Sequence, residues 1–155
     1  EAEAAARELG VDPKLLLSQV ALETGWGKHT PHRGDGTDSH NLFGIKAGSS
    51  WRGARVANTT LEYEQGIPVK KTDYFRAYGS YKESFQDYVG LLRNNPRYAD
   101  ALEKSHVPRQ YMASLQKAGY ATDPNYAGKV MSIYQQWRNF DAAAPAVAAN
   151  PARAG

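Results

Sequence analysis

The sequence has no cysteine, no long apolar run and no dense cluster of positive charge, and each absence excludes a class of protein. Without cysteine the chain forms neither disulfides nor thiolate metal sites, which suits the cytoplasm and the periplasm equally. No apolar stretch approaches the ~20 residues that span a bilayer. Residues 1–10 lack a signal-peptide pattern, so we expect an excised domain. The net charge of +3 is spread along the chain, and no nucleic-acid partner is expected.

The chain has the length of one domain and enough apolar residues for a core. It has 155 residues, of which 41% are hydrophobic. We expect a folded domain over residues 1–140 and an Ala/Pro-rich tail over residues 141–155, where no periodicity is present. A neighbouring molecule or the protein's own groove is expected to hold this tail.

Residues 12–27 predict a helix that carries a carboxylate at its far end. Asp12 and Pro13 are typical of a helix start, and the glycines at 25 and 27 of its end. Its apolar face is predicted to comprise Leu16, Leu17, Val20 and Ala21. Glu23 then lies at the edge of this face, where partial desolvation raises a carboxyl pKa. A protonated acid is what glycoside hydrolysis requires, although a surface glutamate at a frayed helix end is the alternative.

The remaining pattern predicts an α+β protein that is mainly α. Residues 1–10 form a short helix, residues 28–50 a long loop, and residues 56–64 and 67–75 a β-hairpin around Gln65-Gly66. Helices follow after Ser80, Pro96, Pro108 and Asp123. Such an order predicts a cleft between a helical lobe and a small β lobe.

A second acid is predicted on the hairpin. Strand alternation places Thr60, Glu62 and Glu64 on one face, so Glu62 could face Glu23 across the cleft. Two opposed carboxylates suit glycoside hydrolysis, whereas an exposed strand glutamate is the alternative. A metal site is a further alternative, because three histidines and two aspartates share one loop; these are His29, His32, His40, Asp35 and Asp38. No helical His-x-x-x-His pair fixes them, and no metal or other cofactor is expected.

Four motifs occur in a specific order. They are LETGWG at 22–27, NLFGIK at 41–46, FRAY at 75–78, and GYATD at 119–123 followed by Tyr126-Ala127. In these motifs the chain resembles the family 73 glycoside hydrolases, the bacterial glucosaminidases, and more narrowly the hydrolase domain of a flagellar rod protein. The resemblance covers roughly residues 10–137. It implies a lysozyme-like helical lobe with a β lobe, and cleavage of the β-1,4 bond between N-acetylglucosamine and N-acetylmuramic acid in peptidoglycan.

The resemblance also implies roles for single residues. Glu23 matches the family's general acid, Glu62 its second carboxylate, and Tyr120 a tyrosine that lines the cleft. Other residues of the motif stretches are predicted to bind substrate; these are Trp26, Asn41, Phe43, Arg76, Tyr78 and Tyr126. Structural roles stand beside these: Asn41 could cap a turn, Phe43 could form the fold, and Arg76 could pair with an acid under the cleft. Trp26 could instead close the core or shield Glu23 from water.

Three routes of hydrolysis and two other functions stay open at this point. Glu62 could activate water, stabilise positive charge, or support attack by the substrate's own acetamido group. A muramidase or lytic transglycosylase would act on the same polymer, and a non-catalytic wall-binding module would keep the fold. The expected partners are peptidoglycan strands in the periplasm. Flagellar rod proteins would bind only through a domain absent from this chain.

Overall fold

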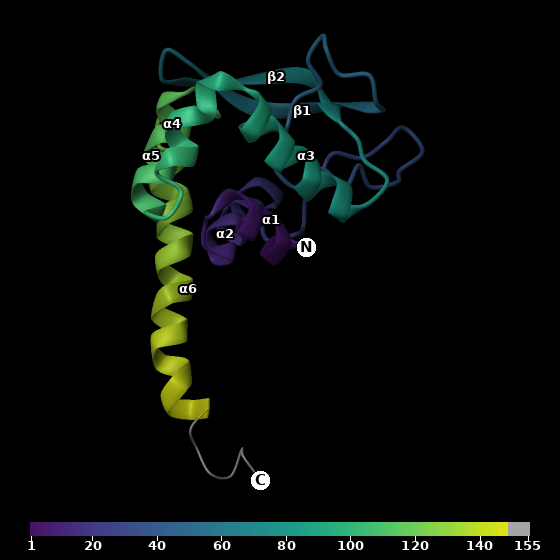
Figure 1. Cartoon of the computed structure of the whole chain (residues 1–155). Helices are drawn as coiled ribbons and strands as arrows, with labels where there is room; N and C mark the ends of the chain where they lie inside the picture. Colours follow the sequence, from purple (N-terminus) through teal and green to yellow (C-terminus); the bar gives the residue numbers. More distant parts are fainter. Residues whose placement is uncertain (149–155) are drawn as a thin grey trace.

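A computed structural model describes residues 1–148, with side chains through residue 141. Within this part the protein is an α+β fold that is mainly helical, as predicted (Figure 1). Its elements in order are α1 (Ala2–Leu9), α2 (Pro13–Thr24), β1 (Arg55–Glu64), β2 (Ile67–Arg76), α3 (Tyr81–Asn94), the 3₁₀ turn η1 (Pro96–Tyr98), α4 (Ala99–Glu103), α5 (Pro108–Lys117) and α6 (Tyr126–Ala148). No helix among the described residues combines the length and apolar character needed to cross a bilayer.

Helix α2 begins and ends where the sequence predicts. A carboxylate oxygen of Asp12 accepts a hydrogen bond from the Lys14 amide at 3.0 Å, and Gly25 ends the helix with a positive φ of 56°. The predicted apolar face is wrong at one position, because Leu17 is exposed. Both α1 and α6 pack against α2, so its buried side also takes in Leu15 and the polar Gln19. Because α2 is packed on two sides, the face that is buried in the structure differs from the apolar face that the sequence predicts.

The helices share one core that forms the floor of the molecule beneath the hairpin. Helix α2 packs on α1 and α6, while α5 packs on α4 and α6 (Figure 1). The inward stripe of α3 has the spacing i, i+3, i+4, i+7, and its residues Phe85, Tyr88, Val89 and Leu92 are all buried. The ring of Phe43 stacks on Tyr88 with centroids 4.0 Å apart, which fastens the long loop over residues 28–50 to α3.

The two strands form a separate antiparallel hairpin. Glu62 pairs with Val69, and the turn at Gln65-Gly66 has positive φ at both residues, 54° and 81°. The hairpin has its own small buried cluster of Val56, Phe75 and Ala77. Within residues 1–148 no helix packs extensively on either strand. The hairpin therefore projects over the helical body as a thin second lobe (Figure 1).

Helix α6 is longer than the sequence predicts. It begins at Tyr126, two residues beyond Pro124, because the Asp123 carboxylate accepts a hydrogen bond from the Asn125 amide in a turn before the helix. It then continues to Ala148, so the secondary structure does not break at the predicted domain boundary of residue 141. Alanine is the strongest helix former, which explains the extension. An ion pair between Lys14 and Asp141 holds this helix to α2. Residues 149–155 of the predicted tail lie outside the described residues.

Candidate active site

A cleft of about 900 Å³ lies between the hairpin and the helical body. Its walls come from the end of α2, the long loop, the middle of β1, the region around η1, and the stretch that precedes α6. The sequence predicts nine residues for catalysis or substrate binding, and seven of them line this cleft; these are Glu23, Asn41, Phe43, Glu62, Arg76, Tyr120 and Tyr126. The predicted cleft between two lobes is thus present, and it is large enough for an extended ligand.

Glu23 lies at the floor of the cleft, on the last turn of α2. Its carboxyl is packed against Gly44, which has a φ of 64° and leaves no room for a side chain of its own. Desolvation by burial raises the pKa of Glu23 from 4.5 to about 7. The Tyr126 hydroxyl opposes this rise and the negative charge of Glu62 adds to it. A large fraction of the molecules therefore carries a neutral, proton-donating Glu23 at neutral pH.

Glu62 reaches the cleft from β1 on the opposite side. Its carboxylate accepts a hydrogen bond from the Thr122 hydroxyl at 2.9 Å and forms an ion pair with Lys46. The side chain is only 14% exposed. Glu64, the other acid on this strand face, is more exposed, pairs with Lys71 and does not line the cleft. Of the two hairpin glutamates, Glu62 is therefore the one placed to act with Glu23.

Tyr120 and Tyr126 both lie beside Glu23, but their hydroxyls have different partners. The Tyr120 hydroxyl donates to the main-chain carbonyl of Phe43 at 3.2 Å. The Tyr126 hydroxyl accepts a hydrogen bond from the amide of Gln19 at 3.1 Å. Burial raises the pKa of each phenol well above its usual value, so both stay neutral. Neither tyrosine can act as an anionic base here.

Asn41 and Phe43 line the cleft, yet their contacts are those of the fold. The amide of Asn41 donates to the carbonyls of Ile45 and Arg76, both at 2.9 Å, and its oxygen accepts from the Ile45 amide at 3.1 Å. The turn-capping alternative for Asn41 is therefore realised. Phe43 is buried against α3. Both residues hold the loop that carries Gly44 against Glu23.

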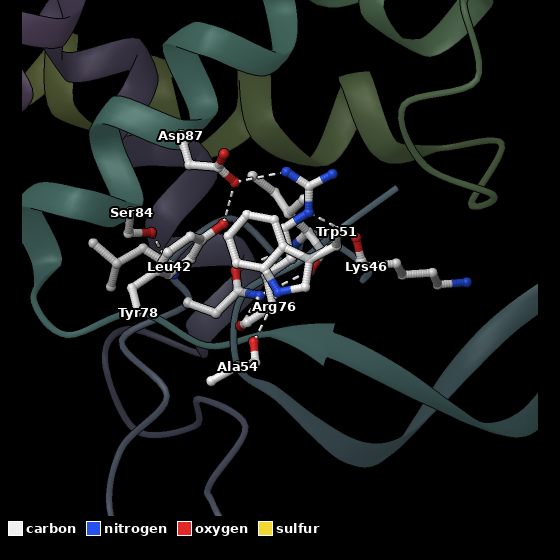
Figure 2. A network of polar contacts seen from close by, with 10 residues as sticks. Leu42, Lys46, Trp51, Ala54, Arg76, Tyr78, Ser84 and Asp87 are labelled. Carbon is white, nitrogen blue, oxygen red and sulfur yellow. Dashed lines mark hydrogen bonds and ion pairs between the residues drawn. The ribbon is translucent and has the colours of Figure 1, made fainter. Parts of the chain in front are cut away.

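Arg76 and Tyr78 meet at a carboxylate behind the cleft (Figure 2). Arg76 donates to Asp87 at 2.9 Å and to the carbonyl of Lys46 at 3.0 Å, and its guanidinium lies 4.6 Å from the ring centre of Trp51. The Tyr78 hydroxyl donates to the same Asp87 oxygen at 2.5 Å. The pairing predicted for Arg76 is thus present. Tyr78 does not line the cleft, and its hydroxyl is already engaged.

Trp26 lies outside the cleft although it follows Glu23 by only three positions. Its side chain is 56% exposed and meets the ring of Trp137 on α6 edge-on, with centroids 5.9 Å apart. The residue has a φ of 61°, which is unusual for a bulky side chain. The idea that Trp26 closes the core is therefore wrong, because the ring faces solvent.

The loop histidines do not assemble into a metal site. Among residues 1–141, no group of three or more His, Asp or Glu side chains is placed to hold an ion. Asp38 instead accepts hydrogen bonds from Thr30 at 2.5 Å and from Tyr81 at 2.8 Å, and it thereby shapes the loop. His29 and His32 line the cleft separately from it.

Comparison with known proteins decides the family. Residues 1–139 match the family model for glucosaminidase, described as mannosyl-glycoprotein endo-beta-N-acetylglucosaminidase. This chain belongs to the glucosaminidase family. Family membership makes it a glycoside hydrolase, and the resemblance drawn from the four motifs is confirmed.

Three individual proteins illustrate how this chain compares with its relatives. It is 50% identical over 145 residues to peptidoglycan hydrolase FlgJ of Pseudomonas aeruginosa, covering 94% of this chain and 36% of that protein. It is 34% identical over 148 residues to a probable N-acetylmuramidase of Lactococcus lactis, covering 91% of this chain and 33% of the other. A crystal structure of a peptidoglycan hydrolase mutant from Sphingomonas sp. A1 matches with a TM-score of 0.81 and 48% identity, covering 86% and 85% of the two chains. This chain therefore spans about a third of both curated relatives.

Several residues of this site have no role in the sequence prediction. Lys46 and Thr122, which hold Glu62, both lie inside the quoted motifs, so the motifs themselves could have indicated them. Gln19 lies one helical turn before Glu23, on the same side of α2, and that i, i+4 spacing was an available signal. Asp87 gave no such signal, because it occupies an ordinary polar position on α3.

Proposed function

We propose that this chain is an endo-β-N-acetylglucosaminidase that hydrolyses the β-1,4 bond between N-acetylglucosamine and N-acetylmuramic acid in peptidoglycan. One observation carries the proposal: a glutamate with a pKa raised to about 7 lies at the floor of a cleft, opposite a second, charged glutamate. Membership of the glucosaminidase family and the names of the curated relatives support it. Such a protein acts in the periplasm, where FlgJ-like hydrolysis would open the wall for the flagellar rod.

In the proposed reaction Glu23 donates its proton to the glycosidic oxygen as the bond breaks. Positive charge then develops on the N-acetylglucosamine ring, and the carboxylate of Glu62 stabilises it or activates the attacking water. Lys46 and Thr122 keep Glu62 directed into the cleft. The neutral hydroxyls of Tyr120 and Tyr126 help to keep the floor of the cleft rigid.

The experiment is hydrolysis of purified peptidoglycan by the wild-type chain and by Glu23→Gln. General acid catalysis contributes about 10²- to 10⁴-fold, so Glu23→Gln should lose at least a hundred-fold in rate. Folding of the variant is checked by circular dichroism. A folded Glu23→Gln protein that clears cell walls at the wild-type rate would refute the assignment. Zymography of the wild type also tests the non-catalytic alternative, which expects no clearing.

A muramidase is the second candidate, favoured by the 34% identity to a probable N-acetylmuramidase. The two activities differ in the sugar left at the new reducing end. Borohydride reduction and mass spectrometry of the digest should give N-acetylglucosaminitol for the proposed activity and N-acetylmuramitol for the alternative. Anhydromuramic ends would instead indicate a lytic transglycosylase.

A further inference from the structure

A line of buried hydrogen bonds leads from the core to the catalytic floor. The hydroxyls of Tyr111 and Tyr88 lie 2.8 Å apart. The Tyr88 hydroxyl donates to the side-chain oxygen Oε1 of Gln19 at 2.7 Å. The side-chain nitrogen Nε2 of Gln19 in turn donates to the Tyr126 hydroxyl at 3.1 Å. All four side chains are buried. They come from α2, α3, α5 and α6, so the line connects four of the helices just beneath Glu23.

The direction of this line follows from counting protons. Tyr88 has a single hydroxyl proton, which it gives to Gln19, so Tyr111 must be the donor in the Tyr111–Tyr88 contact. Gln19 gives an amide proton to the Tyr126 oxygen. The proton of Tyr126 is then not needed by Gln19 and is available to the carboxyl of Glu23. The three donors in the line therefore point toward Tyr126, the residue that lies beside the acid.

We propose that Gln19 is a positioning residue that turns the Tyr126 hydroxyl proton onto Glu23. A carboxylic acid has one protonated oxygen and one bare oxygen, and the bare oxygen is much the stronger hydrogen-bond acceptor. When Tyr126 donates to one oxygen of Glu23, the acid's own proton is kept on the other oxygen. That proton is then presented to the substrate and is not turned toward the core. This inference rests on the proposed role of Glu23 as general acid.

A glutamine suits this task better than other side chains of its size. Its amide has a donor end and an acceptor end, so it can receive the Tyr88 proton and pass a different proton to Tyr126. A buried amide without these partners would be costly, which explains a fully buried Gln19 on a helix face otherwise lined by leucines. The opposing influence of Tyr126 on the pKa of Glu23 agrees with a donor directed at the carboxyl.

The test compares Gln19→Met, Tyr126→Phe and the double variant by two measurements. The first is the pKa of Glu23, followed by ¹³C NMR of the carboxyl with Glu23→Gln used to assign the signal. The second is the pH profile of kcat/KM on purified peptidoglycan. Tyr126→Phe removes the donor, so both the pKa and the high-pH limb should move upward. Gln19→Met should move them in the same direction and lower kcat/KM by roughly ten- to a hundred-fold, the range for a misplaced catalytic group.

The double variant makes the test specific. If Gln19 acts through Tyr126, Gln19→Met added to Tyr126→Phe should cause no further shift in the pKa of Glu23. Tyr134→Phe is the matched control, because Tyr134 is buried on the same helix and donates to Asp12 far from the cleft. It should leave the titration and the pH profile unchanged.

Two results would overturn the inference. One is a folded Gln19→Met protein in which Glu23 titrates as in the wild type. The other is a double variant whose shift equals the sum of the two single shifts, because Gln19 would then act independently of Tyr126. The NMR titration needs no turnover. It therefore separates failure of this inference from failure of the hydrolase proposal, which Glu23→Gln tests alone.

Discussion

Gly44 lies directly against the carboxyl of Glu23: a Cβ atom placed on Gly44 would be 2.6 Å from Oε2 of Glu23. The backbone at Gly44 also has a φ of 64°, which disfavours any residue with a Cβ. Close approach and positive φ thus both favour glycine at this position. The loop that begins after α2 returns here to complete the pocket in which Glu23 is desolvated.

Gly44→Ala should therefore reduce both stability and activity. Strain at the left-handed position costs about 1–2 kcal/mol, and the displaced carboxyl should lower kcat/KM by at least ~10-fold. Urea unfolding and the release of soluble muropeptides measure the two effects. Gly48→Ala is the control, because it lies in the same loop with nothing within 4 Å and no positive φ. Equal behaviour of the two variants would contradict the close packing of Gly44 and Glu23.

Glu23→Gln should stabilise the fold at high pH while it removes activity. The pKa of Glu23 is about 7 in the folded protein and 4.5 ordinarily, so the folded state binds the proton more tightly. The resulting stability is present below pH 4.5 and is lost as the pH rises through 7. Glutamine avoids that loss. The free energy of unfolding of the variant should therefore exceed that of the wild type by up to about 3 kcal/mol at pH 9, and the two should be equal at pH 4. Thermal unfolding at both pH values checks this prediction. If the difference in stability between the variant and the wild type is the same at pH 4 and at pH 9, Glu23 is not a desolvated acid.

The two partners of the Glu62–Lys46 ion pair should shift the pH profile in opposite directions. The charge of Glu62 raises the pKa of Glu23. In the activity that Glu62→Gln retains, the high-pH limb of the kcat/KM profile should therefore move to lower pH. Lys46→Gln leaves Glu62 unpaired and should move the limb upward. Lys71→Gln breaks the neighbouring pair with Glu64, outside the cleft, and serves as the control with an unchanged limb. Shifts of the same sign from both substitutions would rule out this electrostatic coupling.

Tyr78→Phe should affect folding more than substrate binding. Its hydroxyl already donates to Asp87 at 2.5 Å and does not line the cleft (Figure 2). We expect the free energy of unfolding to fall by about 1.5 to 3 kcal/mol, as for a lost hydrogen bond to a charged group, with KM unchanged. Urea unfolding and steady-state kinetics separate the two effects. A higher KM with unchanged stability would restore the substrate-binding role that the motif predicts.

The sequence was sufficient to predict the starts of α2 and α3 and the hairpin, because these depend on local chemistry. Asp12, Ser80 and the Gln65-Gly66 turn each act within a few residues, and all three are where the pattern places them. The position of Glu23 at the edge of the apolar face also followed from helical spacing alone. Its partnership with Glu62 needed strand alternation and the family resemblance together.

Long-range packing was not predictable in the same way. The exposure of Trp26 depends on Trp137, more than 100 residues further on, and on a positive φ that nothing in the side chain announces. The role of Gln19 depends on tyrosines from three other helices. Periodicity marks which side of a helix is apolar, but it does not reveal which polar residue the neighbouring helices will enclose.

The hairpin holds its shape through its own ladder and touches the stretch before α6 through Thr122, which accepts from the Tyr63 amide at 3.1 Å and donates to Glu62. The other end of the hairpin is fixed through Arg76, which binds Asp87 on α3 and the carbonyl of Lys46. A cross-linked polymer has few free chain ends, so an enzyme that acts on it must bind the middle of a chain from the side. We expect the proposed substrate to enter the cleft from the side, between Glu62 on the hairpin and Glu23 on the helical floor.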